Sequence, residues 1–276
     1  MLYFVFKLNL DFNMDFAKIN DISIHFNHLK HDENKPTIVF SNSLGTDFRI
    51  WQKCVDDLVK DHSILLYDKR GHGLSGLGKT PYVIENHVDD LIALMDELKI
   101  SNALLVGLSV GGLIVQGVYH KRPELVSGLV LCDTAAKIGN ETMWNERIEI
   151  ARKGGLEALV EANMQRWFSP NFHKNRQIDL RGYEAMFTRT PLEGYIGTGT
   201  AIRDADFTPN ASSISVPTTC VVGEYDGATN PELVEGTSKL IPGSKFEIIK
   251  DAGHIPCVEQ PKEIIRVIRE IETLSR

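Results

Sequence analysis

The sequence predicts an α/β fold: a mostly parallel sheet of eight strands with helices on both faces, and an all-helical cap inserted before the last two strands. Two observations predict the sheet. Short apolar, β-branched runs alternate with amphipathic helical patterns over 14–133, and this alternation resumes over 216–276. A third observation predicts the cap, because the segment 134–215 contains helical patterns and no convincing strand.

Length and composition limit the classes of protein to consider. A chain of 276 residues that is 42% hydrophobic can bury a sizeable core. A net charge of −7 without a basic cluster disfavours nucleic acid as a partner. No apolar run has the length of a membrane span, so we expect a cytoplasmic protein with no membrane partner. The four cysteines lie far apart, and we expect buried free thiols.

The individual elements can be placed in order along the chain. Residues 1–13 show no period, and we expect them to form an extension without regular structure. A hairpin over 16–26 turns at Asn20-Asp21. Strands are expected at 37–41, 63–67, 104–108, 128–132, 218–222 and 245–249. Core helices are expected at 50–58, 83–98, 231–241 and near the C-terminus, and cap helices at 142–153, 156–168, 177–187 and 192–204.

One buried strand ends in a Gly-x-Ser-x-Gly motif centred on Ser109 and passes straight into a helical pattern. The order of strand, sharp turn and helix is typical of a nucleophile elbow, in which a strained turn lifts the serine above the sheet. The amide of Val110, at the helix start, would supply half of an oxyanion hole. The second donor is expected in the small-residue loop 42–46, from the backbone amide of Ser43, with Leu44 as the second choice.

Ser109 is followed in the chain by a carboxylate and a histidine that each come after a late strand. Asp226 follows the penultimate strand and His254 the last one, and this Ser, Asp, His order is that of the α/β-hydrolases. A serine hydroxyl becomes a nucleophile when an imidazole takes its proton, and a carboxylate fixes the tautomer of that imidazole. Asp133 also ends a core strand and competes with Asp226, unless it only caps a helix at the start of the cap.

Two further patterns suggest a cofactor or a metal, but their context does not favour either. Gly71, Gly73 and Gly76 match Gly-x-Gly-x-x-Gly, yet no helix opens at them, as the binding of a dinucleotide phosphate requires. The three histidines within 25–31 have no acidic or cysteine partner at ligand spacing. We therefore expect no cofactor and no metal.

Several stretches resemble one subfamily of the α/β-hydrolases, the 3-oxoadipate enol-lactonases of the β-ketoadipate pathway. The most specific are 131–139 (LCDTAAKIG) and 143–148 (MWNERI), whereas the elbow is shared by all serine hydrolases of this fold. The chain departs from the subfamily at Val110, where methionine is commoner, and at Asn230, where proline is frequent. The other matching stretches are 41–46, 67–73 and 254–261.

The resemblance implies a carboxylic ester hydrolase whose partner is a small lactone bearing a free carboxylate. Water would open 3-oxoadipate enol-lactone to 3-oxoadipate through an acyl-enzyme on Ser109, without a metal or an organic cofactor. A cation must face the pocket to attract the carboxylate into an acidic protein. Arg147 is our candidate for this cation, and Trp144, on the same helical face, would supply an apolar wall.

The residues leave rival functions and roles open. The same triad serves a carboxylesterase or a meta-cleavage C–C hydrolase, and this fold and triad also occur in ligand receptors that turn over very slowly. For Arg147 the structural alternative is a salt bridge with Glu146 or Glu149, and Arg166 and Arg189 are the next candidates for the carboxylate. The sequence is compatible with a homo-oligomer and does not select among similar lactones.

Overall fold

The computed structural model describes residues 14–31 and 35–274 and contains an eight-stranded sheet in the order β1-β2-β4-β3-β5-β6-β7-β8. β1 and β2 form an antiparallel hairpin and β2 is antiparallel to β4, whereas all other neighbours are parallel. The mostly parallel sheet predicted from the sequence is confirmed, and the extension expected over 1–13 lies outside the described residues. The strands are β1 (Asp15–Ile19), β2 (Ile22–Leu29), β3 (Thr37–Ser41), β4 (Ile64–Tyr67), β5 (Ala103–Leu108), β6 (Val126–Cys132), β7 (Thr218–Gly223) and β8 (Lys245–Ile249).

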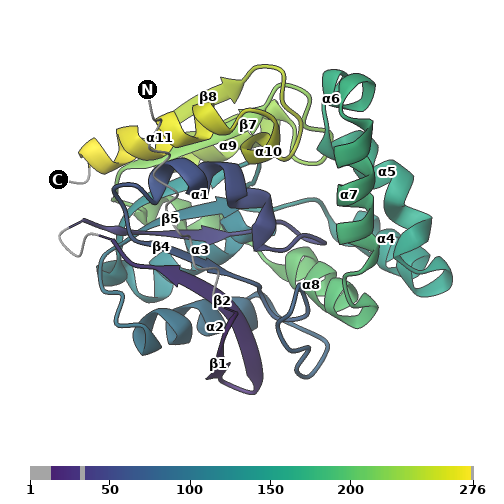
Figure 1. Ribbon diagram of the computed structural model, residues 1–276, viewed down its shortest axis with the longest axis horizontal. Coiled ribbons are helices and arrows are strands. Elements are labelled where there is room, and N and C mark those ends of the chain that lie inside the picture. Colours follow the sequence, from purple (N-terminus) through teal and green to yellow (C-terminus); the bar gives the residue numbers. More distant parts are fainter. Residues whose placement is uncertain (1–13, 32–34, 275–276) are drawn as a thin grey trace, which may run out of the picture.

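Helices cover both faces of this sheet (Figure 1). α1 (Gln52–Leu58) packs against α11 (Pro261–Leu274), and α2 (Ile84–Glu97) packs against α3 (Val110–Lys121). Every residue of β5 is buried, as a continuous apolar strand requires when both faces of the sheet are covered. The apolar residues of α11 recur at helical spacing and form its buried stripe: Ile264, Val267, Ile268 and Ile271.

The remaining core elements complete the connections between the strands. They are η1 (Phe48–Trp51), η2 (Pro123–Leu125), α9 (Pro231–Leu240) and α10 (Pro256–Glu259). The single helix expected over 50–58 is two elements, because a 3-10 turn capped by the Asp47 side chain precedes α1. In the described residues, no helix is both long enough and apolar enough to cross a membrane.

The segment 134–215, which we call the cap, contains helices and no strand of the sheet. Figure 1 shows α4, α5, α6 and α7 grouped at one end of the sheet, with α8 below them. Three of the four expected cap helices are present as single helices, and the one expected over 156–168 is a 3-10 turn, η3, followed by α5. A short helix, α6, is one that the sequence did not predict. The elements are α4 (Glu141–Gly154), η3 (Leu156–Leu159), α5 (Val160–Trp167), α6 (Pro170–Asn175), α7 (Gln177–Thr188), α8 (Leu192–Asp204) and η4 (Thr208–Ser213).

The glycine motif at 71–76 serves the packing of this cap. Gly71 has a positive φ of 70°, and a Cβ on it would collide with the backbone of Gly194 in α8. Gly73 also has a positive φ, and a Cβ there would overlap the Asp68 carboxyl. The two glycines therefore let the cap and a carboxylate approach the loop closely, which accounts for them without a phosphate.

Candidate active site

The Gly-x-Ser-x-Gly motif forms a sharp turn between β5 and α3. Ser109 has φ 58° and ψ −118°, a conformation that is strained for any residue with a side chain. Its amide donates to the carbonyl of Cys132 at 3.0 Å, and its carbonyl accepts from the Thr134 hydroxyl at 2.6 Å. Hydrogen bonds to the neighbouring strand and the loop after it therefore hold the strained turn in place.

The glycines on either side of Ser109 are required by the close approach of the backbone. A Cβ on Gly107 would collide with the carbonyl of Gly111, and a Cβ on Gly111 would collide with the carbonyl of Ser41 in β3. A helix packed this tightly on its own strand brings the first helical amide, that of Val110, directly beside the serine. This is the local structure that the sequence predicted for an elbow.

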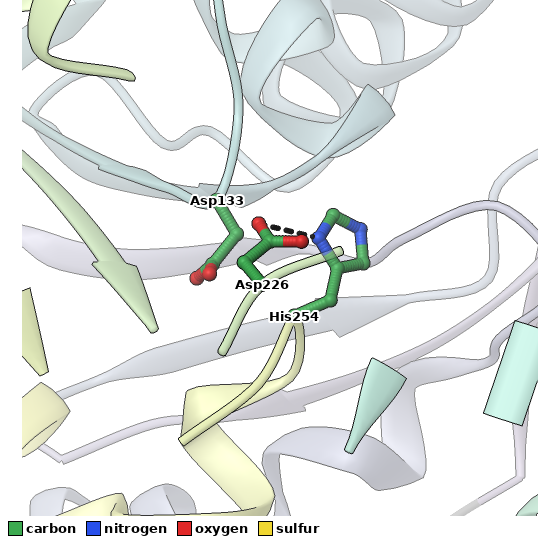
Figure 2. A group of neighbouring side chains, drawn as sticks. All are labelled: Asp133, Asp226 and His254. Atoms are coloured by element: carbon green, nitrogen blue, oxygen red, sulfur yellow. Dashed lines mark hydrogen bonds and ion pairs between the residues drawn. The ribbon is translucent and has the colours of Figure 1, made fainter. Parts of the chain in front are cut away.

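Asp226 and His254, which lie 28 residues apart in the chain, meet at the carboxyl edge of the sheet (Figure 2). His254 Nδ1 lies 2.9 Å from Asp226 Oδ2, and both side chains are buried. Asp226 also accepts from the Thr229 hydroxyl at 2.7 Å and from the amides of Ala228 at 2.7 Å and Thr229 at 3.1 Å. Burial opposes its charge, but His254 and these hydrogen bonds outweigh burial and lower the pKa of Asp226.

Asp133, the competing carboxylate, lies at the end of β6 beside Asp226. Its Oδ1 accepts from the amide of Gly223 at 2.8 Å, and its Oδ2 has no hydrogen-bond partner among the described residues. It does not cap a helix, so that expectation is wrong: its backbone amide and Oδ1 both bond β7. Its side chain makes no hydrogen bond to His254 in the described residues, whereas His254 Nδ1 lies 2.9 Å from Asp226 Oδ2 and 3.4 Å from the Thr229 hydroxyl.

The loop 42–46, expected to supply an oxyanion donor, is held by a buried lysine that sequence reasoning missed. Lys69 Nζ donates to the carbonyl of Ser43 at 2.6 Å, and the same carbonyl accepts from the hydroxyl of Thr46 at 2.9 Å. Burial lowers the pKa of Lys69 to about 7, although Asp68 and Asp47 act in the opposite direction. Because the carbonyl of Ser43 faces Lys69, the amide of Leu44 in the same trans peptide points the opposite way.

In the cap, Trp144 and Arg147 lie together on α4. Trp144 is buried and donates from Nε1 to the carbonyl of Ile138 at 2.8 Å. The Arg147 guanidinium lies 5.7 Å from the centre of the Trp144 ring and donates from Nε to the Tyr195 hydroxyl at 2.7 Å. Its Nη2 donates to Asn163 Oδ1.

Arg147 makes no ion pair with a carboxylate in the part of the chain that the structure describes, so the alternative pairing with Glu146 or Glu149 is not formed. Arg166 on α5 also lacks an acidic partner there, and burial together with the charge of Arg147 lowers its pKa. The Nδ2 donor of Asn163 is buried and unpaired. The cap thus places two cations and a free amide donor together without an internal anion.

The cap packs directly on the loops that carry the predicted site. A Cβ on Gly45 would contact Phe187, and one on Gly227, next to Asp226, would contact Arg166. Arg189, the third candidate arginine, is exposed. It lines a cavity of about 890 Å³ between α7, η1 and β2. Ser109, Asp226 and His254 are not among the residues that line this cavity.

Other predicted features have structural explanations that involve no ligand. His25 Nδ1 lies 2.8 Å from Asp68 Oδ2 in a buried contact. Asn230, where the resembling subfamily often has proline, caps α9 by accepting from the amide of Leu233 at 3.0 Å. The four cysteines are free and buried, as expected.

Comparison with known proteins gives consistent results at the level of family, sequence and structure. Residues 38–267 match the model of the alpha/beta hydrolase family. The chain is 35% identical to 3-oxoadipate enol-lactonase 1 of Acinetobacter baylyi over 85% of this chain and 88% of that protein. It is 32% identical to 3-oxoadipate enol-lactonase 2 of the same organism, over 86% and 89% of the two chains. The crystal structure of the enol-lactonase from Burkholderia xenovorans superposes with a TM-score of 0.89 at 34% identity and covers 94% of this chain and 100% of that one.

Proposed function

The chain belongs to the alpha/beta hydrolase family, and from this premise we propose that it is a serine hydrolase that opens 3-oxoadipate enol-lactone with water to give 3-oxoadipate. The observation that carries the proposal is the strained backbone of Ser109 at the sheet edge where Asp226 and His254 are hydrogen-bonded. The identity to two enol-lactonases over most of both chains supports the choice of substrate.

The chemistry begins with the transfer of a proton from Ser109 to His254. Asp226 is anionic and accepts a hydrogen bond from Nδ1–H of His254, so the ring presents Nε2 as the base toward the serine. The Ser109 oxygen attacks the lactone carbonyl, and the amides of Val110 and of the 42–46 loop, from Ser43 or Leu44, stabilise the oxyanion. No hydrogen bond joins Ser109 to His254 in the described residues, and such contacts commonly tighten only when the substrate binds.

Collapse of the tetrahedral intermediate breaks the ring C–O bond. Because the ester is cyclic, the enolate that forms stays attached to the acyl group on Ser109, and it takes the proton that His254 received from the serine. Protonation converts this enolate to a ketone, which makes ring opening favourable. Water activated by His254 then attacks the acyl-enzyme and releases the acid. These steps use side chains of the protein and one water molecule, and they call for no organic cofactor or metal.

The carboxylate of the substrate takes no part in this chemistry and needs a partner of its own. Arg147 supports this role because its guanidinium is held by neutral groups, Tyr195 and Asn163, and retains its full charge for a ligand. Arg166, whose pKa is lowered by burial and by the charge of the nearby Arg147, adds a second cation. Trp144 lies beside the guanidinium and supplies an apolar wall.

The four free thiols favour a reducing, cytoplasmic location.

The function is tested with purified protein and the enol-lactone, with 3-oxoadipate measured as the product. Many turnovers per site, abolished in Ser109→Ala and retained in the exposed control Ser212→Ala, would support the proposal. A p-nitrophenyl ester and a meta-cleavage ring-fission product serve as rival substrates. Preference for either rival would overturn the lactone assignment, and very slow turnover of all three would favour a ligand receptor.

A further inference from the structure

Two carboxyl groups lie side by side at the buried edge of the sheet, and the proposed mechanism uses only one of them. An oxygen of Asp133, an oxygen of Asp226 and a ring nitrogen of His254 all lie within 4.8 Å of one another. Figure 2 shows the three side chains converging from three different chain segments. Asp133 has no exposed surface.

The surroundings of the two carboxyls differ in the number of hydrogen-bond donors. Asp226 accepts four hydrogen bonds, two from backbone amides and two from side chains. Asp133 accepts one, from the amide of Gly223, and among the described residues its Oδ2 has no donor and no lysine or arginine pairs with it. An ionised Asp133, buried beside the Asp226 carboxylate with a single hydrogen-bond donor, would cost free energy. A protonated, neutral Asp133 avoids this cost.

We propose that Asp133 carries a proton at neutral pH and donates its hydroxyl hydrogen to the carboxylate of Asp226, which makes Asp133 a positioning residue for the acid of the triad. Its Oδ1 remains the acceptor for Gly223, and the hydroxyl on Oδ2 gains the acceptor that this atom otherwise lacks. The catalytic consequence rests on the proposed roles of Asp226 and His254. The protonation itself does not depend on them.

The ionisable groups around Asp133 favour the neutral acid. Burial raises the pKa of Asp133 well above its usual range, and the negative charge of Asp226 adds to this effect. Glu259, on α10, acts in the same direction through its charge. His254 faces Asp226 and is hydrogen-bonded to it. The thiols of Cys132 and Cys257 have pKa values raised by burial and carry no charge that would offset the anion.

A hydroxyl donor changes how Asp226 acts on the histidine. A fifth hydrogen bond draws charge away from the carboxylate and adds a further restraint on its orientation. Removing this donor leaves Asp226 more basic and less firmly oriented, so the imidazolium is favoured at higher pH. Asparagine preserves the arrangement, because its carbonyl accepts from Gly223 and its amide donates to Asp226, whereas leucine removes both functions.

Protonation is measured directly by infrared difference spectroscopy between the wild type and Asp133→Asn at pH 7. We expect the variant to lose a protonated carboxyl stretch that shifts in deuterium oxide. Loss of carboxylate bands instead would show an ionised Asp133 and overturn the proposal. This measurement needs no substrate, so it can succeed or fail independently of the proposed function.

The positioning role is measured in the pH profile of kcat/KM on a substrate that the enzyme turns over. We expect Asp133→Asn to leave the acidic midpoint and kcat unchanged, and Asp133→Leu to move that midpoint upward and lower kcat about 10-fold, the effect of one lost hydrogen bond. A downward move in Asp133→Asn would mean that a negative charge had been removed, and would overturn the proposal. If Asp133→Leu does not fold, the Asp133→Asn profile still decides between these outcomes.

Discussion

The charged groups at the carboxyl edge of the sheet and those in the cap differ in the hydrogen-bond partners that the protein gives them. At the sheet edge, Asp226 receives four internal hydrogen bonds and Lys69 donates to backbone carbonyls of the 42–46 loop. In the cap, Arg147 donates only to neutral groups and Arg166 has no acidic partner in the described residues. The charged groups Asp226 and Lys69 are thus hydrogen-bonded within the protein, whereas the cap retains charge that a ligand can neutralise.

This difference assigns separate tasks to the two regions. Groups that the protein has already oriented need no reorganisation during a reaction, so a carboxylate held by internal hydrogen bonds, such as Asp226, suits the chemical step. A guanidinium without an internal anion gains its partner only on binding, so the cap suits substrate selection. Changes at the edge should lower turnover on every substrate, and changes in the cap should depend on the charge of the substrate.

The largest effect is expected at the elbow. Ser109→Ala removes the nucleophile and leaves the strained turn, whose hydrogen bonds are made by the backbone and Thr134. We expect kcat to fall about 10⁵-fold or more on the enol-lactone and on a neutral ester alike, with an unchanged melting temperature. Activity near that of the wild type on either substrate would exclude a covalent Ser109 mechanism.

The next largest effect is expected at the acid of the triad. Asp226→Asn removes the charge that fixes the histidine tautomer, and we expect kcat to fall about 10³ to 10⁴-fold on both substrates. Asp133→Asn is the matched control, a carboxyl-to-amide change at the same edge, and we expect activity near that of the wild type. The reverse ranking of the two variants would assign the acid to the end of β6.

The fold class was predictable because most core strands are short apolar runs that alternate with helical patterns, whereas the order of the strands in the sheet was not predicted. The β1–β2 hairpin could be placed from its Asn-Asp turn and is confirmed. The short helix α6 was missed because its six residues, of which the first is a proline, are too few to show a helical period. The 3-10 turn before α1 was missed because its residues continue the apolar face of that helix.

The candidate site also contains contacts that could be predicted from the sequence and contacts that could not. The contact between Asp226 and His254 could be predicted because both residues follow strands that end at one edge of the sheet. The contact of Lys69 with the Ser43 carbonyl could not be predicted, because the two residues lie 26 positions apart. A lysine that follows a strand also gives no sign in the sequence that it is buried. Tyr195, 48 residues from Arg147, was missed for the same reason: cap helices pack in an order that the periodicity of each helix does not reveal.

A smaller and selective effect is expected in the cap. Arg147→Ala removes a charged hydrogen bond to the substrate carboxylate, a loss of about 1.5 to 3 kcal/mol, so kcat/KM on the enol-lactone should fall roughly 10 to 150-fold. On an uncharged ester we expect little change. Arg152→Ala, in the same helix at an exposed position, is the control and should affect neither substrate.

Equal losses on the charged and uncharged substrates in Arg147→Ala would give this arginine a structural role through Tyr195 and Asn163. Arg166→Ala would then be tested in the same pair of assays. If both arginine variants lost activity regardless of substrate charge, the expectation that changes in the cap depend on substrate charge would be wrong.

The last prediction concerns stability rather than turnover. It tests whether the buried Lys69 at the sheet edge is neutral above pH 7, through the pH dependence of the free energy of unfolding. Burial lowers the pKa of Lys69 to about 7 in the folded protein, from an ordinary value of 10.5 that the unfolded chain retains. Between these two pH values the unfolded state binds the extra proton, so the free energy of unfolding rises with pH, by up to about 1.4 kcal/mol per pH unit. Below pH 7 both states are protonated and the contribution is constant. Urea unfolding from pH 6 to 9.5 should show this rise in the wild type and in the exposed control Lys262→Met, but not in Lys69→Met; equal slopes in all three proteins would mean that Lys69 stays charged at the sheet edge.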